Sequence, residues 1–334
     1  GLGLPDGILG SAWPSMHIDI GVHVDYAGYI QMIIALGTII SSLFSSRLTK
    51  KLGTGKLTFI SVLMTAVALL GFSYSNQYWM LLLWAIPYGL GAGSVDAALN
   101  GYVALNYGSH HMSWLHCMWG LGASFGPYII GNILALGYPW DTGYRVMGLI
   151  QVGLSLILFL SLPAWRMVRE AKIRKKAEEN QKSDFETSEV HESGDDLSFS
   201  DVLKIPGAKQ ILLAFFAYIA VETSTGLWIA SYLNLSRNFS AIDAAKWASL
   251  FYIGITVGRA INGFLTFIFR DKHLIRGGAF LIILGTVLLI LAPHPYILLA
   301  GILLLGLGCA PVYPSIIHQT PDIFGQDKVY AMVG

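Results

Sequence analysis

Three acidic residues lie inside apolar stretches of the sequence, where a carboxylate is out of place. Asp6 stands in Gly-Leu-Pro-Asp-Gly, Asp96 has apolar residues on both sides, and Glu222 follows a long apolar and aromatic run. A charge at the middle of a membrane costs roughly 2.5–3.5 kcal/mol on insertion scales, so its presence there indicates a function. Burial favours the protonated form of an acid, which is the property that a proton carrier needs. These residues are the predicted proton-coupling residues.

The sequence also leaves a structural role open for two of these acids. Asp6 would lie near a helix end if the chain is trimmed at its start. Asp96 would serve packing if it hydrogen-bonds to a neighbouring helix. Asn100 follows Asp96 by one turn on the same face. Arg259 is expected either to hold a carboxylate such as Glu222 or to face a cytoplasmic cavity.

Further polar and aromatic side chains are candidates for contact with a small polar solute. His116 is a single imidazole among apolar neighbours, either a packing residue or part of a proton relay. Gln319 closes an apolar stretch, where a helix boundary explains it as well as solute contact does. The face of an indole suits the apolar face of a sugar. The predicted solute contacts are Asn100, Trp13, Trp228, Asn262, Gln319 and His116.

Helices that cross a membrane must position these groups. The chain of 334 residues has 54% hydrophobic and only 12% charged residues, against about 25% charged in soluble domains. Apolar runs of about 20 residues predict membrane-spanning helices, and continuous runs exclude the alternating pattern of a β-barrel. The net charge of +1 gives no sign of nucleic-acid binding. The predicted spans are Gly1–Met16, Tyr26–Leu48, Lys56–Tyr74, Tyr78–Leu105, Met112–Leu136, Tyr144–Pro163, Ala208–Leu235, Ala241–Phe269, Leu274–Leu291 and Tyr296–Thr320.

Lysine and arginine gather in every second connection between these spans. Because cytoplasmic loops carry the excess of positive charge, the N-terminus and the central segment are predicted to be cytoplasmic, in a protein of the plasma (inner) membrane. Arg237 and Lys246 are exceptions on an outer connection. Residues 164–206 begin basic and become acidic, so they form either an amphipathic helix on anionic lipid or a solvated linker. They divide an N-terminal bundle (1–163) from a C-terminal bundle (207–334).

The two sets of helices repeat one another in order. Repeated halves across a central cavity are typical of secondary transporters. In the last predicted span, Tyr313 and Pro314 are expected to break the helix, as suits a gating helix. The matching residues of the two halves are Asp6 with Glu222, Trp13 with Trp228, Gly37 with Gly258, and Gly89–Gly93 with Gly306–Ala310.

Gly89–Val103, in which Asp96 precedes Asn100 by one turn, resembles the fourth-helix motif of the fucose/galactose/glucose:proton symporter family. Lys50 and Lys51 resemble that family's variant of a cytoplasmic signature in which an Asp-Arg pair is usual. The resemblance implies an all-α polytopic membrane protein with the major facilitator fold, two pseudo-symmetric six-helix bundles, here trimmed in the first helix and after the tenth. It also implies that Asp96 takes part in proton-coupled sugar transport.

Two departures from the family pattern accompany this resemblance. The slot before Pro14 that holds an acid in bacterial fucose carriers is Gly10 here, and the fourth-helix acid is Asp rather than Glu. The chain nevertheless predicts alternating access with symport of a proton, or of sodium, and a sugar or similar solute. Proton-driven export of an amphiphilic compound and a transport-dead receptor or scaffold are the alternatives. With no nucleophile–base pair, nucleotide loop or metal-spaced cluster, we expect no enzyme, cofactor or metal.

Overall fold

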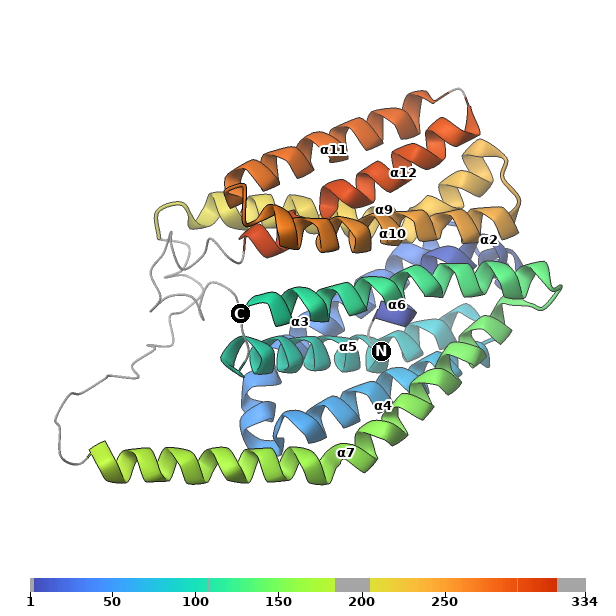
Figure 1. The fold of residues 1–334 in the computed structure, drawn as a ribbon. Coiled ribbons are helices and arrows are strands. Elements are labelled where there is room, and N and C mark those ends of the chain that lie inside the picture. The colour runs from blue at the N-terminus through green and yellow to red at the C-terminus, as the bar shows by residue number, and fades with distance from the viewer. Residues whose placement is uncertain (1–2, 107–108, 184–204, 293, 317–334) are drawn as a thin grey trace.

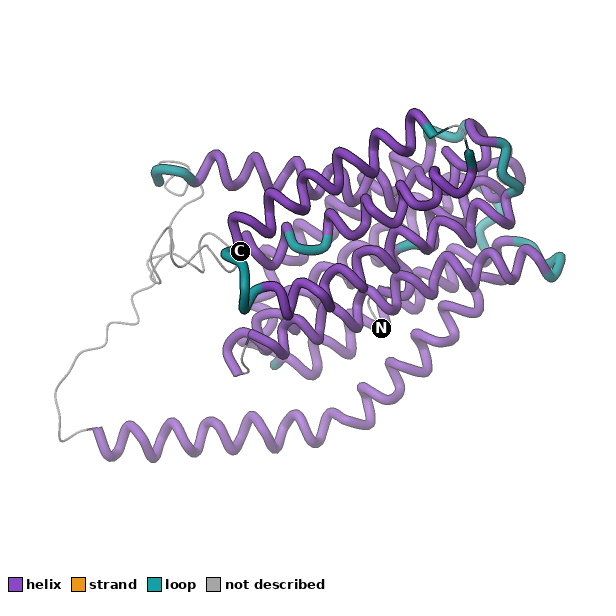
Figure 2. The backbone as a smooth tube through the Cα atoms, turned by 45° about the horizontal axis from the view of Figure 1, so that its top comes forward, coloured by secondary structure: helices purple, strands orange, loops and turns teal. Residues whose placement is uncertain are grey.

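The computed structural model describes residues 3–106, 109–183, 205–292 and 294–316, which contain helices and no strand. Figure 1 and Figure 2 show the helices running side by side along one direction. Eight of the described helices are long and apolar enough to cross a membrane. The helices are α1 (Gly3–Asp6), α2 (Ile8–Ile20), α3 (Tyr26–Leu52), α4 (Thr54–Ser73), α5 (Tyr78–Asn106), α6 (Ser109–Ala135), α7 (Trp140–Ser183), α9 (Ala208–Arg237), α10 (Ala241–Leu265), α11 (Asp271–Leu291) and α12 (Pro295–Cys309).

Local signals end these helices where the apolar runs end. Gly21 follows α2 with φ of 74°, a left-handed conformation that glycine adopts without a steric penalty. The amide of the next residue, Val22, then donates to the carbonyl of His17 at 3.0 Å, which closes the helix. At the start of α10, the Ser240 hydroxyl accepts from the Asp243 amide at 3.0 Å.

The first and tenth spans are each interrupted. α1 ends at Asp6, Gly7 forms a turn, and α2 begins at Ile8. In the tenth span the helix was expected to break at Tyr313 and Pro314, and this position is wrong. The break lies at Ala310 and Pro311, before a helical turn over 312–316. Proline in the interior of a helix cannot donate to the preceding turn, whereas one in the first turn, such as Pro314, loses nothing.

α7 is longer than the sequence predicted. It continues from Trp140 past Pro163 to Ser183, so the start of the predicted linker is helical. Residues 184–204 of that linker lie outside the described residues. Figure 1 shows α7 bending, and its distal part reaching beyond the bundle. An interior proline is the usual cause of such a bend.

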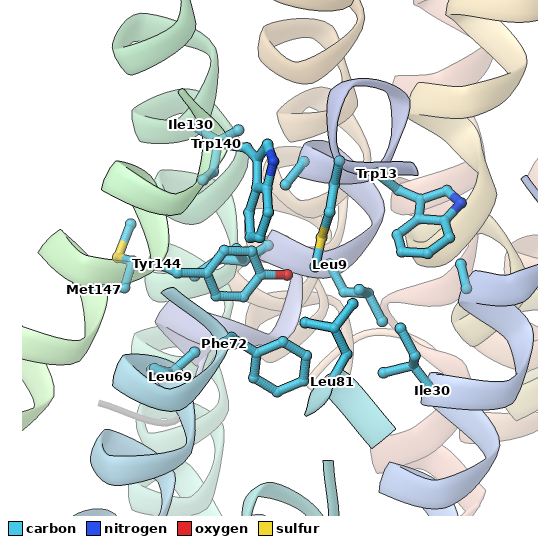
Figure 3. Close-up of a cluster of buried hydrophobic side chains, with 14 of the residues drawn as sticks. Leu9, Trp13, Ile30, Leu69, Phe72, Leu81, Ile130, Trp140, Tyr144 and Met147 are labelled. Atoms are coloured by element: carbon cyan, nitrogen blue, oxygen red, sulfur yellow. The ribbon is translucent and has the colours of Figure 1, made fainter. Parts of the chain in front are cut away.

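The buried apolar side chains form two clusters, one mostly from α2–α7 and one mostly from α9–α12. Figure 3 shows the first, in which the ring of Tyr144 stacks on Phe72 with centroids 5.3 Å apart. Large apolar side chains also cover the outside, for example Leu160 (68% exposed) and Phe280 (64%). An outer surface of this kind is what contact with lipid requires.

Glycines let equivalent helices of the two halves pack in the same way. A Cβ on Gly37 of α3 would lie 3.2 Å from Gly89 of α5, and one on Gly254 of α10 would lie 3.0 Å from Gly306 of α12. By this packing, the residue of the second half that is equivalent to Gly37 is Gly254, and not Gly258, with which the sequence comparison paired it. The two halves thus share the same glycine-to-glycine contact between equivalent helices.

The two halves meet along α6 and α10 and where α2 crosses α9. At the crossing, Gly10 lies so close to the backbone of Gly226 and Leu227 that a Cβ on Gly10 would meet the Leu227 carbonyl oxygen at 2.7 Å. Small residues allow this close approach. Among the described residues, the repeat-equivalent helices α5 and α12 do not pack together in this way.

Candidate functional site

A cavity of about 180 Å³ lies between the two halves, at the level where the first span is interrupted. Residues from both halves line it, and two of the three predicted acids, Asp6 and Glu222, are among them. Non-helical backbone inside a membrane is tolerated where it borders a cavity, as it does at Gly7. The lining residues are Pro5, Asp6, Leu9, Gly10, Gln31, Ile34, Leu69, Phe72, Tyr88, Trp119, Tyr144, Glu222, Thr223, Gly226, Leu227 and Tyr252.

Asp6 is open to this cavity and accepts two hydrogen bonds across it. The indole N–H of Trp119 on α6 donates to Oδ2 at 2.6 Å, and the hydroxyl of Tyr88 on α5 lies 3.4 Å from Oδ1. The first distance is that of a strong, charge-assisted bond, and the second is long for a hydroxyl donor. Asp6 is thus held mainly by Trp119.

Trp119 also contacts the half-buried cation of the site, Arg259. The guanidinium carbon of Arg259, on α10, lies 4.8 Å from the centroid of the Trp119 ring, which is cation–π distance. In the part of the chain that the structure describes, no carboxylate oxygen lies within 4.0 Å of Arg259. Its charge still interacts with both Glu222 and Asp96. The structure therefore places Arg259 between the acids without pairing it with one.

Glu222 lies on α9, on the C-terminal side of the cavity. The hydroxyl of Tyr218, one turn earlier, donates to its Oε2. The neighbouring Thr223 lines the same cavity, and the buried ring of Tyr252 on α10 stands opposite. The carboxylate thus has one hydroxyl donor and one nearby cation, each of which stabilises its ionised form.

Asp96 lies on α5 outside the lining of the cavity but within the same group of charges. Its side chain is exposed, hydrogen-bonds to Asn100, and interacts electrostatically with Arg259 and with Asp6. The Oδ1 atom of Asn100 is buried and accepts no hydrogen bond from the described residues. The predicted pair of Asp96 and Asn100 is therefore present as a hydrogen-bonded unit with one open acceptor.

Besides Asn100, four of the predicted solute contacts lie elsewhere than on the cavity wall. Trp13 is 0% exposed and its indole N–H donates to the carbonyl of Val24 at 2.6 Å, so it belongs to the core. Trp228 packs against the same core beside Gly28. Asn262 is 6% exposed, with a buried Oδ1 that has no partner among the described residues.

The ring of His116, the fourth of these, packs edge to face against Tyr313 with centroids 5.5 Å apart, and His116 interacts with the charge of Arg259. Tyr313 also contacts Phe215 of α9, so the predicted gating residue bridges three segments. Lys51 is exposed at the end of α3. Gln319 and the side chain of Lys50 lie outside the described residues.

Sequence reasoning missed the aromatic groups that surround the acids. Trp119 stands three residues after His116, in a segment that was read for its histidine alone. Tyr88 and Tyr252 carry hydroxyls in the middle of apolar helices, a signal that would have found them. Hydroxyls of buried tyrosines usually have a partner. Here these residues give the acids their donors and the cavity its walls.

The electrostatics of the site follow from a count of its charged groups. Three carboxylates, Asp6, Asp96 and Glu222, interact with one another or with a single cation, Arg259. One guanidinium cannot balance three ionised acids, and like charges at close range disfavour joint ionisation. The arrangement is suited to binding protons or a monovalent cation. Among the described residues, no group of three His, Cys, Asp or Glu side chains is placed to hold a metal ion.

Comparison with known proteins agrees with this architecture. The family model described as Major Facilitator Superfamily matches residues 2–334. The chain belongs to the Major Facilitator Superfamily. This confirms the predicted all-α membrane fold.

Relatives and solved structures of this superfamily resemble the chain at low identity. It is 24% identical to the Saccharomyces cerevisiae protein named Bypass of stop codon protein 6 over 243 residues, 69% of the chain and 48% of the yeast protein. It is 23% identical to the Glucose/mannose transporter GlcP of Bacillus subtilis over 282 residues, 83% of the chain and 66% of that protein. The chain thus spans about half of the first relative and just under two thirds of the second.

Two crystal structures share the fold across nearly the whole chain. The chain is similar to a D-xylose-proton symporter, with a TM-score of 0.68, 14% identity and coverage of 99% of the chain and 83% of the symporter. It is similar to a peptide transporter, with a TM-score of 0.70, 16% identity and coverage of 99% and 82%. At these identities the likeness concerns the fold alone.

Proposed function

We propose that the protein is a secondary active transporter that moves a sugar or similar small polar solute together with a proton by alternating access. The observation that carries the proposal is the imbalance of charge around the cavity, where the described residues place three acids, Asp6, Asp96 and Glu222, near one cation, Arg259. Relatives that carry names of sugar transporters support the substrate class. The predicted orientation, with the N-terminus and central segment cytoplasmic, is part of the same proposal.

Protonation is the step that would couple the two fluxes. A proton on one of the acids lowers the cost of closing the low-dielectric protein around the site, and its release on the other side restores the charge. Asp96 is the leading candidate for the proton-binding residue, because it hydrogen-bonds to Asn100 and interacts electrostatically with Arg259. Glu222, which also interacts with Arg259, is the second candidate. Solute hydroxyls would bind Gln31, Thr223 and Tyr252 on the cavity wall.

Sugar-dependent proton uptake by the full-length protein in proteoliposomes tests this proposal. D-glucose, D-mannose and D-xylose are added in turn, and the pH outside the vesicles is recorded for wild type and Asp96→Asn. Asp243→Asn is the matched control, because Asp243 is an exposed helix-cap residue far along α10 from the cavity. Alkalinisation that Asp96→Asn abolishes and Asp243→Asn keeps supports the symporter. Sugar entry without proton movement contradicts proton coupling and leaves sodium to be tested in the same vesicles.

Export of an amphiphilic compound is the second candidate, because five aromatic residues line the cavity: Phe72, Tyr88, Trp119, Tyr144 and Tyr252. The direction of flux separates the two. A pH gradient that drives a dye such as ethidium out of vesicles, with no sugar effect, would favour export.

A further inference from the structure

Trp119 is the one residue of the described cavity wall whose ring is contacted by charges of opposite sign from the two halves. Its N–H donates to Asp6 of α1 at 2.6 Å, and Arg259 of α10 lies 4.8 Å from the ring centroid. The two contacts use different parts of the indole, its edge and its face. Both contacts can therefore be made at the same time.

The electron density of the indole ring connects these two contacts. An ionised carboxylate at the N–H pushes electron density into the indole, and the attraction of a cation to the face grows with that density. A neutral carboxylic acid at the same place is a weaker acceptor and leaves the ring less negative. The hold of the ring on the guanidinium therefore depends on whether Asp6 is ionised.

We infer that Trp119 is a positioning residue that transmits the charge state of Asp6, in the N-terminal half, to Arg259 in the C-terminal half. When Asp6 is ionised, the indole keeps Arg259 on its face, away from the other acids. When Asp6 takes up a proton, the guanidinium is released toward Glu222 and Asp96, with which it already interacts. This inference rests on the proposed proton-coupled transport.

The other ionisable groups around the pair are known from the structure. Tyr88 and Asp96 of α5, Glu222 of α9 and Tyr252 of α10 interact with Asp6, and Tyr144 of α7 lines the same cavity. Around Arg259 lie His116, Cys309 and Tyr313 in addition to the two acids. Trp119 touches both Asp6 and Arg259, at the distances given above. A purely structural role for the indole would need only its bulk, which phenylalanine largely keeps.

Trp119→Phe separates the two roles, because it keeps an aromatic ring and removes the N–H donor. Trp13→Phe is the matched control. Its indole N–H also donates at 2.6 Å, but to the backbone carbonyl of Val24, which carries no titratable charge. Both variants are made in the full-length protein and reconstituted in proteoliposomes with D-glucose or D-xylose as the probe.

The two readouts are sugar exchange at equal pH and accumulation driven by a pH gradient. In Trp119→Phe we expect exchange to persist and accumulation to fall about tenfold, within the range usual for coupling between sites. Trp13→Phe should accumulate sugar as the wild type does. Unchanged accumulation in Trp119→Phe overturns the inference, and so does a parallel loss of exchange and accumulation, which would mark Trp119 as a binding or packing residue.

A second measurement uses protons alone as the probe, so it stands even if no sugar is transported. Spin labels at Leu136 and Tyr296, both exposed at the same end of the two halves, report their separation in protein without Cys117 and Cys309. We expect this distance to change with pH in wild type and Trp13→Phe and to stay constant in Trp119→Phe. A change in Trp119→Phe equal to that of the wild type overturns the inference, as does a wild type that shows no change. Absence of sugar flux with the expected distances contradicts the proposed substrate class only.

Discussion

The Nη2 atom of Arg237, at the end of α9, lies 2.6 Å from the carbonyl oxygen of Leu289 and 2.7 Å from that of Ile290, at the end of α11. The last carbonyls of a helix have no partner within the helix, and a cation there also meets the negative end of the helix dipole. Its Nε donates to the hydroxyl of Tyr232 at 2.8 Å. This contact explains why Arg237 breaks the charge pattern of the connections, because it caps a helix.

Replacement of Arg237 should therefore destabilise the protein. Arg237→Gln removes charge-assisted hydrogen bonds to the last carbonyls of α11, and we expect a loss of about 1–3 kcal/mol in the free energy of unfolding. Thermal unfolding in detergent measures it. Arg270→Gln, at the opposite and exposed end of α11, should change stability by less than about 0.5 kcal/mol. Equal losses in the two variants would contradict the capping role.

The crossing of α2 and α9 gives a second prediction. In Gly10→Ala the new Cβ would lie 2.7 Å from the carbonyl oxygen of Leu227, and backbone cannot rotate away as a side chain can. We expect the variant to populate the state in which α2 and α9 are apart, because overpacking costs about 1–3 kcal/mol. Labelling of a single cysteine placed at Gly28, by a thiol reagent added outside, should become faster.

Gly153→Ala is the control for this change, since a Cβ there meets no atom within 4 Å. It should leave the labelling rate as in the wild type. The same rate in all three proteins would show that the crossing does not close the cavity on that side.

Glu222 gives a third prediction. Glu222→Gln keeps the shape of the side chain and its contact with Tyr218 but cannot carry a proton or balance Arg259. We expect accumulation driven by a pH gradient to fall about tenfold or more. The uptake of labelled sugar at a series of external pH values measures it. Wild-type accumulation and pH profile in the variant would remove Glu222 from the coupling residues.

The connection between α2 and α3 gives a prediction on pH. The hydrogen bond from His23 holds the pKa of Asp25 below its ordinary value of 3.8. A lowered pKa means that the ionised form is favoured in the folded protein, so the contact exists above pH 3.8 and is lost as the pH falls through the folded pKa. Both side chains are exposed, so we expect no measurable effect on global stability.

His23→Gln checks the cause of this shift. Without the imidazole the pKa of Asp25 should rise toward 3.8, which carbon-13 NMR of labelled aspartate can follow. His294→Gln, at another exposed connection, is the control and should leave Asp25 unchanged. A pKa that does not respond to His23→Gln would assign the shift to the backbone.

The sequence predicted the helices well because lipid imposes a simple rule on them. Each of the ten apolar stretches is helical over most of its described residues, since an apolar run of about 20 residues has no other way to satisfy its backbone in a membrane. The errors concern prolines, whose effect on a helix depends on their position in it. Pro163 does not end α7, and Pro311 rather than Pro314 interrupts the tenth span.

The site was predictable in part. Acids stand out in apolar runs, and Asp6, Asp96 and Glu222 do share one electrostatic neighbourhood. Which face of a helix meets the cavity depends on tertiary packing, which hydropathy does not report, so Trp13 was expected on a wall and lies in the core. The same packing explains Gly10: at this crossing there is no room for a larger side chain, such as the acid that the family resemblance led us to expect there.

The excess of acids over Arg259 also has a consequence for voltage. With Asp6, Asp96 and Glu222 ionised, the site is negative, and the membrane potential acts on it with about 2.3 kcal/mol per elementary charge per 100 mV. In a cell whose interior is negative, that force pushes the empty site to face outward, where protons and solute arrive. Once protons bring the net charge of the three acids and Arg259 to zero, the force disappears and, in the proposed symport, the loaded site can turn inward. The return of the empty carrier to the outward-facing state would then be the step of the transport cycle that moves net charge across the membrane.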